Sequence, residues 1–191
     1  MRIFVADSPS SSWQRGTELL KRAACLYDAP GSVLADEARG AWRTGFTGGA
    51  AWMANGLALV RGQPAATVPP NVGRWGALKY GGALLSAGVA GGFASGLGAP
   101  LAVALVVAGL AFYAAEAQGL FLFPLLLDGT EHPWRSGRAL LRRAGGTPSA
   151  MGTVLMLAGV MLLGGVVGRG WLRCWCLGCL AVVLWYEDLR T

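Results

Sequence analysis

Residues 80–115, YGGALLSAGVAGGFASGLGAPLAVALVVAGLAFYAA, form a run of 36 positions without a charged side chain. About 20 apolar residues are enough for a helix to cross the hydrocarbon of a bilayer, so this run has room for two helices. Its centre, GGFASGLGAP at 91–100, is rich in glycine and ends in a proline. That composition predicts a break between the two helices, with the second starting near Pro100.

The composition of the whole chain is that of a membrane protein. Of its 191 residues, 54% are hydrophobic and 14% are charged, whereas a soluble domain has about 25% charged residues. A second uncharged run covers residues 144–168. We therefore expect an all-α integral membrane protein. The net charge of +6 does not indicate a nucleic-acid partner, because membrane proteins collect Lys and Arg at one face of the bilayer and no RNA- or DNA-binding motif accompanies the charge.

The chain divides into two predicted regions. Residues 1–43 are polar and mixed in charge, and we expect a cytoplasmic amphipathic segment at the membrane surface. Residues 44–191 form the helical membrane domain, in which 44–60 is either interfacial or a marginal span. The predicted spans are about 76–95, 100–127, 148–168 and 171–187. A helix over 100–127 would extend about 42 Å and exceed a hydrocarbon core of about 30 Å, so Gly119 and Pro124 are candidate kink sites.

The distribution of basic residues predicts the orientation. With four spans, 14 of the 16 Lys and Arg residues lie on one side, and Arg169 and Arg173 lie on the other. If residues 44–60 also cross the bilayer, the Lys and Arg residues are divided equally between its two sides. The positive-inside rule therefore favours four spans with both termini in the cytoplasm, with five spans as the alternative. Because nearly all the basic residues are Arg, a bias found in GC-rich bacterial genomes, we expect a multi-pass protein of a bacterial inner (plasma) membrane.

Glu116 is the first candidate functional residue, because it stands alone between the apolar runs 99–115 and 117–127. An acidic side chain within the hydrocarbon is costly and marks a functional site by default. Tyr113 lies one turn earlier on the same helical face. The two are candidate catalytic residues of a membrane enzyme acting on a lipophilic substrate. Two alternatives stay open: Glu116 lies at the headgroups, or it is a structural partner for a polar group on another helix.

A basic segment and two rows of small residues are candidate interaction sites. WRSGRALLRR at 134–143 predicts a helix with an arginine stripe that binds an anion, either an anionic lipid headgroup or an isoprenyl phosphate, the alternative being ordinary positive-inside charge. Its arginines are Arg135, Arg138, Arg142 and Arg143. The small-residue rows predict close packing of the helix 76–95 on two faces, with a homodimer seam as the alternative. They consist of Gly82, Ser86 and Ala90 in one row and Gly88, Gly92 and Gly96 in the other.

The stretch RCWCLGC at 173–179 holds three of the four cysteines. At 100° per residue, Cys174 diverges from Cys176 by about 200° and from Cys179 by about 140°. With no histidine nearby, we expect no metal site. Cys176 and Cys179 share a helical face and form a candidate redox pair, which the predicted topology puts near the outer, oxidising end of the last helix. The alternative is that both are small apolar packing residues.

Cys176-Leu-Gly-Cys179 resembles the C-x-x-C that opens the last helix of the four-helix vitamin K epoxide reductase family. The resemblance covers these four residues and implies a thiol–quinone oxidoreductase. The shuttle cysteines that this family carries in an external loop are missing, since the remaining cysteine, Cys25, falls in the N-terminal segment.

The sequence contains no nucleotide-binding loop, catalytic triad or paired-carboxylate site, and it indicates no cofactor. We therefore expect a small polytopic membrane protein of accessory, assembly or lipid-organising type. Its expected partners are the lipid bilayer and another membrane protein or a second copy of itself. The two enzymatic readings, one built on Glu116 with the arginine segment 134–143 and one on Cys176 with Cys179, are kept as alternatives.

Overall fold

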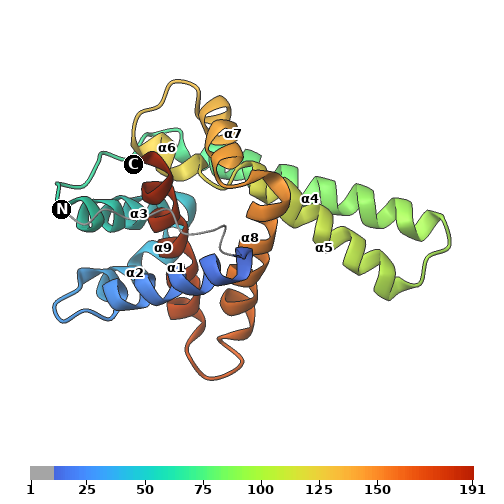
Figure 1. The fold of residues 1–191 in the computed structure, drawn as a ribbon, viewed down its shortest axis with the longest axis horizontal. Helices are drawn as coiled ribbons and strands as arrows, with labels where there is room; N and C mark the ends of the chain where they lie inside the picture. The colour runs from blue at the N-terminus through green and yellow to red at the C-terminus, as the bar shows by residue number, and fades with distance from the viewer. Residues whose placement is uncertain (1–10) are drawn as a thin grey trace.

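The computed structural model describes residues 11–191, and this part of the chain is all-helical, with nine helices and no strand (Figure 1). The helices are α1 (Ser12–Tyr27), α2 (Val33–Arg43), α3 (Gly45–Arg61), α4 (Val72–Gly96), α5 (Leu101–Gln118), α6 (Leu122–Leu127), α7 (Pro133–Arg143), α8 (Gly146–Leu163) and α9 (Trp171–Arg190). The all-α prediction is thus confirmed for these residues. The first ten residues of the predicted cytoplasmic segment lie outside the described part.

Helix α9 lies at the centre of the helical body, which comprises every helix except α4 and α5. Leu180, Ala181 and Val183 are fully buried, and α1, α3 and α8 pack around the helix. Near its end, Trp185 packs edge-on against Phe121 at a centroid distance of 5.4 Å. The helix that the sequence predicts as the last span is therefore the core helix of the body.

Helix α1 packs against α8 and α9 and is tied to both ends of α9 by ion pairs. Arg22 on α1 donates hydrogen bonds of 2.6 and 3.0 Å to Asp188, near the end of α9. Asp28, directly after α1, accepts hydrogen bonds from Arg173, near the start of α9. The N-terminal helix is therefore part of the same packed unit as α8 and α9.

Helices α4 and α5 form a hairpin that projects from the body as an arm (Figure 1). A turn over 97–100 joins them, with Gly98 at a φ of 80° that favours glycine. The helices approach closely at Gly91, where an added Cβ would lie 3.0 Å from the Cβ of Ala108. The break that the sequence predicts within 91–100 therefore falls at 97–100, next to Pro100.

The glycine rows of α4 do not mediate packing within the chain. A Cβ added at any of four glycines would meet no atom within 4 Å: Gly82, Gly88, Gly92 and Gly96. Ser86 only donates a hydrogen bond to the carbonyl oxygen of Gly82 within the helix, and Ala90 is half-buried. Within one chain α5 therefore covers the face that carries Gly91 and not these rows, and close packing of the rows against another chain stays a prediction.

The predicted single helix over 100–127 is broken. Helix α5 ends at Gln118, and α6 begins at Leu122, with Gly119 capping α5. A Cβ at Gly119 would lie 3.1 Å from Cγ of Lys79, so the missing side chain makes room for that lysine. Of the two kink sites considered, the break is at Gly119, whereas Pro124 lies inside α6.

Two segments of the described chain are long and apolar enough to cross a membrane, Leu101–Leu127 and Gly146–Leu163. Only 11% and 28% of their most apolar windows are buried within the protein. The apolar helices at the core of a soluble domain are mostly buried, so this exposure gives weak support to a membrane protein.

Candidate functional site

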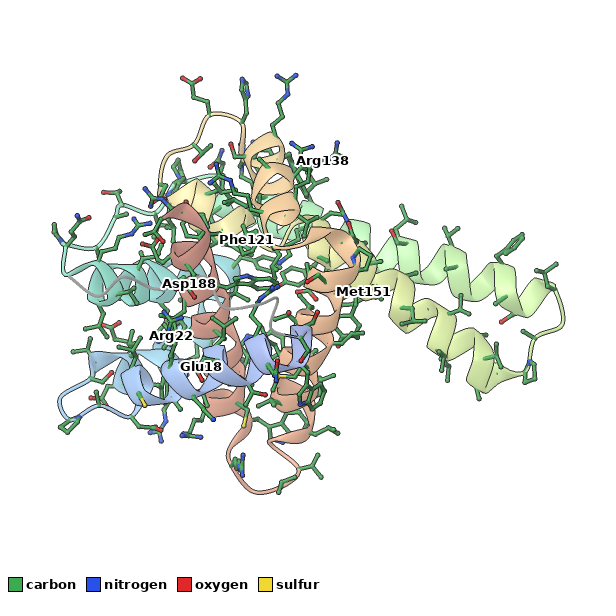
Figure 2. All side chains as sticks on the ribbon, in the orientation of Figure 1. Glu18, Arg22, Phe121, Arg138, Met151 and Asp188 are labelled. Carbon is green, nitrogen blue, oxygen red and sulfur yellow. The ribbon has the colours of Figure 1, made fainter. Side chains whose placement is uncertain are left out.

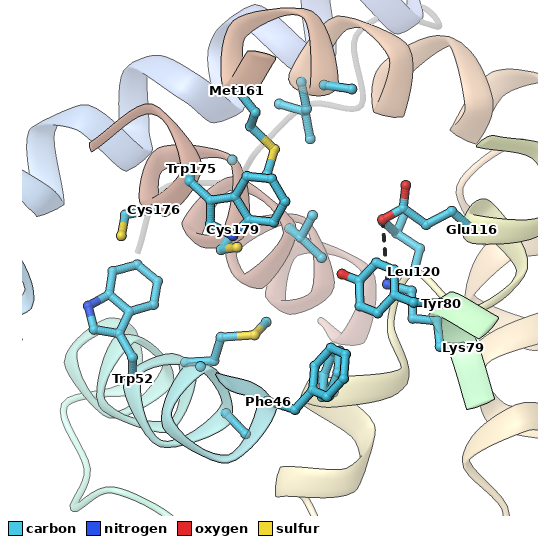
Figure 3. Close-up of a pocket in the computed structure, with 18 of the residues that line it drawn as sticks. Phe46, Trp52, Lys79, Tyr80, Glu116, Leu120, Met161, Trp175, Cys176 and Cys179 are labelled. Atoms are coloured by element: carbon cyan, nitrogen blue, oxygen red, sulfur yellow. Dashed lines mark ion pairs between the residues drawn. The ribbon is translucent and has the colours of Figure 1, made fainter. Parts of the chain in front are cut away.

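A cavity of about 550 Å³ lies where the base of the α4–α5 hairpin meets α2, α3, α8 and α9 (Figure 3). Its walls are predominantly apolar and aromatic. Trp42, Phe46 and Trp175 line it and are also partly exposed to the outside, so they frame its mouth. Trp42 and Trp175 pack edge-on with centroids 5.8 Å apart. A cavity of this size and character suits a lipophilic ligand of small-molecule size.

The cavity contains one ion pair, between Lys79 on α4 and Glu116 on α5. The Nζ of Lys79 lies 3.7 Å from Oε1 of Glu116, and the two side chains are 5% and 18% exposed. The ammonium also lies 4.9 Å from the ring centroid of Tyr80 and 5.6 Å from that of Phe123. A buried charge needs such partners to offset its lost hydration. The pair is the polar centre of an otherwise apolar space.

Two tyrosines accompany this pair. Tyr113, the residue predicted to act with Glu116, lines the cavity and packs edge-on against Phe112. Tyr80 also lines it and stacks on Phe46 with a centroid distance of 5.6 Å. Their phenol groups are the kind of polar contact that orients a ligand in an apolar pocket.

Both cysteines of the C-x-x-C line the same cavity, on the side opposite Lys79 (Figure 3). Cys176 is buried and Cys179 is half-buried, and neither is in a disulfide. Cys174 does not line the cavity. It packs against the end of α8, where a Cβ at Gly164 would collide with its sulfur. The structure therefore brings Cys176 and Cys179 together with Glu116 and leaves Cys174 elsewhere.

The arginine segment is not part of the cavity. Arg135, Arg138, Arg142 and Arg143 lie on α7 and are exposed. Figure 2 shows Arg138 pointing away from the body. Arg143 donates a hydrogen bond of 3.3 Å to the carbonyl oxygen of Leu189. A catalytic site that combines Glu116 with this segment is therefore not formed, because none of its arginines is among the cavity-lining residues.

A second polar cluster, at Asp128, is structural. The carboxylate accepts hydrogen bonds from Arg61 at 2.7 and 3.1 Å, from Tyr186 at 2.5 Å and from Arg190 at 2.7 Å. Arg61 also donates to Glu187. Burial alone would raise the pKa of Asp128, but the hydrogen bonds from Arg61 and Tyr186 and the nearby positive charges hold this pKa below its usual value. The cluster ties the end of α3 and the loop after α6 to the end of α9. Across residues 11–191, no three His, Cys, Asp or Glu side chains are placed to hold a metal ion.

Lys79 is the main residue of the cavity that the sequence analysis does not single out. A signal for it exists. Lys79 directly precedes the uncharged run 80–115 and Glu116 directly follows it. If the run folds as a symmetric hairpin, its two bounding charges must meet at the base. Tyr80, Trp42 and Phe46 carried no such signal.

The fold and the cavity can also be compared with known proteins. Comparison with protein-family models, with curated proteins and with solved structures gave no match to this chain.

Proposed function

We propose that this protein is a membrane protein that binds a lipophilic molecule in the cavity at the base of the α4–α5 hairpin, without catalysing its conversion. The observation that supports this most directly is the combination of a cavity of about 550 Å³ with one buried ion pair, Lys79–Glu116. The sequence suggests a protein of accessory, assembly or lipid-organising type, and binding a lipid without converting it is the lipid-organising role.

The chemistry of the lining indicates the class of ligand. The ammonium of Lys79 donates to a carbonyl, carboxylate or phosphate oxygen, and the carboxylate of Glu116 accepts from a hydroxyl. The aromatic and aliphatic walls favour a ring system or an acyl or isoprenyl chain. A cavity of 300–1,000 Å³ holds a molecule of drug size, so a longer tail would leave through the mouth framed by Trp42, Phe46 and Trp175. We therefore expect a lipid or quinone with a polar head.

Purification in mild detergent followed by solvent extraction and mass spectrometry tests this proposal. Gly49→Phe fills the cavity, since Gly49 lines it and a Cβ there meets no atom within 4 Å. Gly40→Phe is the matched control, because Gly40 is an exposed α2 glycine with the same open surroundings. We expect the first variant to retain about tenfold less ligand, which corresponds to about 1.4 kcal/mol of binding free energy. Equal retention by both variants, or no extractable ligand from the native protein, would contradict the proposal.

A thiol–quinone oxidoreductase is the second candidate, because Cys176 and Cys179 both line the cavity. In such a reaction the two thiols lose two electrons and two protons and form a disulfide. The bound quinone gains both electrons and both protons and becomes a hydroquinone. Shared access to one cavity is the arrangement this transfer requires, because donor and acceptor must touch.

Alkylation with N-ethylmaleimide before and after incubation with decylubiquinone tests the second candidate. Oxidation would remove Cys176 and Cys179 together from the labelled pool and leave Cys25, which is exposed, unchanged. It would also reduce one quinone per disulfide formed. Unchanged labelling of the pair would exclude the redox candidate and leave the binding proposal standing.

We also propose that the protein belongs to a bacterial inner membrane, with both termini in the cytoplasm. The positive-inside count and the exposed apolar helices α5 and α8 support this placement. The basic-residue count by itself favours four spans, with five as the alternative, whereas the arrangement of the helices leads to a different topology, a single inserted hairpin. Fractionation of membranes from an expressing bacterium tests the location, and a protein recovered in the soluble fraction would contradict it.

A further inference from the structure

The distal part of the α4–α5 hairpin exposes apolar side chains on nearly all sides. On α4 the exposed large residues are Leu84, Leu85, Val89 and Phe93, in the turn Leu97 is exposed, and on α5 they are Leu101, Val103, Leu105, Val106 and Leu110. Phe93, Leu97 and Leu101 each have at least 70% of their surface exposed. An uncovered apolar surface of this extent marks an interaction with a membrane or another protein.

The angular spread of these residues indicates which partner covers them. At 100° per residue, the exposed positions span about 180° of the circumference of α4 and about 200° of that of α5. A helix seam with another protein occupies a stripe of about 100°. A second copy of the chain would therefore leave most of the arm uncovered. Hydrocarbon chains surround an inserted helix on every free side, so the bilayer is the partner that fits.

The base of the hairpin has the features of a membrane interface. Trp75 on α4 packs against Trp134 on α7 with centroids 6.4 Å apart, and Trp is enriched at headgroup level. The arginines of α7 are exposed beside it, where anionic headgroups would meet them. From Tyr80 to Leu97 the arm extends about 26 Å, close to the hydrocarbon thickness of about 30 Å.

Helix α8 is long and apolar enough to cross a membrane, but its orientation and that of α9 do not fit the same role. Figure 1 shows them running across the direction of the hairpin. The ion pairs Arg22–Asp188 and Asp28–Arg173 place α1 next to both ends of α9. If α9 crossed the bilayer, its two ends would lie on opposite faces, and one short helix on the cytoplasmic side would not reach both.

We propose that the α4–α5 hairpin is the membrane-inserted arm of this protein, and that the body with α1, α8 and α9 stays on the side of the bilayer that holds the termini. The arginines of α7 then lie at the headgroups around the base of the arm. This inference does not depend on a ligand in the cavity, and it replaces four spans by one hairpin.

Single-cysteine labelling tests the topology. All four native cysteines are replaced by alanine, and circular dichroism checks the helical fold. One cysteine is then introduced by Val167→Cys in the α8–α9 turn, by Thr191→Cys at the C-terminus or by Leu97→Cys at the hairpin tip. Right-side-out and inverted membrane vesicles are treated with a membrane-impermeant maleimide.

The inserted arm predicts that positions 167 and 191 react in the same vesicle orientation. It further predicts that position 97 reacts in the opposite orientation, or in neither if the tip ends within the lipid. Reaction of 167 and 191 from opposite faces would restore the four-span topology and overturn the inference. Reaction of 97 from the same face as 191 would also overturn it. Ligand binding in the cavity is measured by a different experiment, the extraction described above, so none of these labelling outcomes tests the proposal for the cavity.

Discussion

Lys79 and Glu116, the two charged residues that bound the 36-residue uncharged run, meet at the base of the hairpin with 3.7 Å between Nζ and Oε1. The ion pair joins the two ends of this uncharged run at the point where the arm meets the body. It also forms the polar centre of the cavity. The same ion pair therefore joins α4 to α5 at the base of the hairpin and supplies the polar groups that could bind a ligand in the cavity.

Removing one partner of this pair is expected to cost more than removing both. Glu116→Gln leaves a buried ammonium without its counter-charge, and Lys79→Met leaves a carboxylate. An unpaired buried charge costs about 3 kcal/mol of stability or more. Because the side chain of Lys79 is 5% exposed and that of Glu116 is 18% exposed, Glu116→Gln should be the more harmful single change.

Thermal unfolding in detergent, followed by circular dichroism, measures this coupling. The double variant Lys79→Met/Glu116→Gln is expected to unfold at a higher temperature than Glu116→Gln alone, since it contains no unpaired charge. If the effects of the two single changes simply add in the double variant, the residues do not interact and the pair is incidental.

The sequence was sufficient for the hairpin because its signals are local. A long uncharged run, a glycine-rich centre and a proline after the turn specify two helices and their junction, whereas for the next break the sequence leaves two candidates, Gly119 and Pro124. The sequence was also sufficient to select Glu116, since a lone acid between apolar runs is visible without a fold.

The rest depends on contacts between distant segments. The burial of α9 follows from its packing against α1, α3 and α8, contacts that its own sequence does not reveal. Which glycine of α4 packs against α5 also depends on tertiary contacts. A helix rich in Gly and Ala has small residues on every face, so its sequence does not single out Gly91. The meeting of Cys179 with Lys79 across one cavity has no local signal at all.

Acid is expected to destabilise the body through Asp128. Its pKa is lowered in the folded state, so the ionised carboxylate favours folding. That contribution is complete above the unfolded pKa of about 3.9 and is lost as the pH falls through the lower folded value. Asp128→Asn should therefore lower stability at pH 7 and flatten the decline of stability below about pH 4.

Chemical unfolding at a series of pH values in detergent checks this prediction. Asp36→Asn is the control, because Asp36 is exposed in the first turn of α2. An acid dependence that is the same in Asp128→Asn and in the native protein would show that other groups determine it.

The hairpin is expected to tolerate a large side chain at Gly92 but not at Gly91. A Cβ at Gly91 already lies 3.0 Å from Ala108, whereas one at Gly92 meets nothing within 4 Å. Gly91→Leu should separate the two helices at a cost of about 1–3 kcal/mol. Limited proteolysis of the detergent-solubilised protein should then cut the Gly91→Leu hairpin faster than the Gly92→Leu hairpin. Equal cutting would mean that α4 and α5 do not pack through this face.

A positive charge on the exposed surface of the arm, about a third of the way from its base, is expected to weaken membrane attachment. Leu85 is 69% exposed on α4, and in the inserted arm it faces acyl chains. Placing an arginine at the centre of a membrane helix costs about 2.5–3.5 kcal/mol. Leu59→Arg is the matched control, because Leu59 is also exposed, at 49%, but lies on α3 in the body.

Membrane flotation measures the effect as the fraction of protein that migrates with lipid. Leu85→Arg should reduce this fraction, and a second charge from Val106→Arg on the facing helix should reduce it further. Leu59→Arg should float like the native protein, because the body contacts only headgroups and water there. If Leu59→Arg loses as much membrane attachment as Leu85→Arg, α3 is also embedded in hydrocarbon, and the hairpin is not the sole anchor.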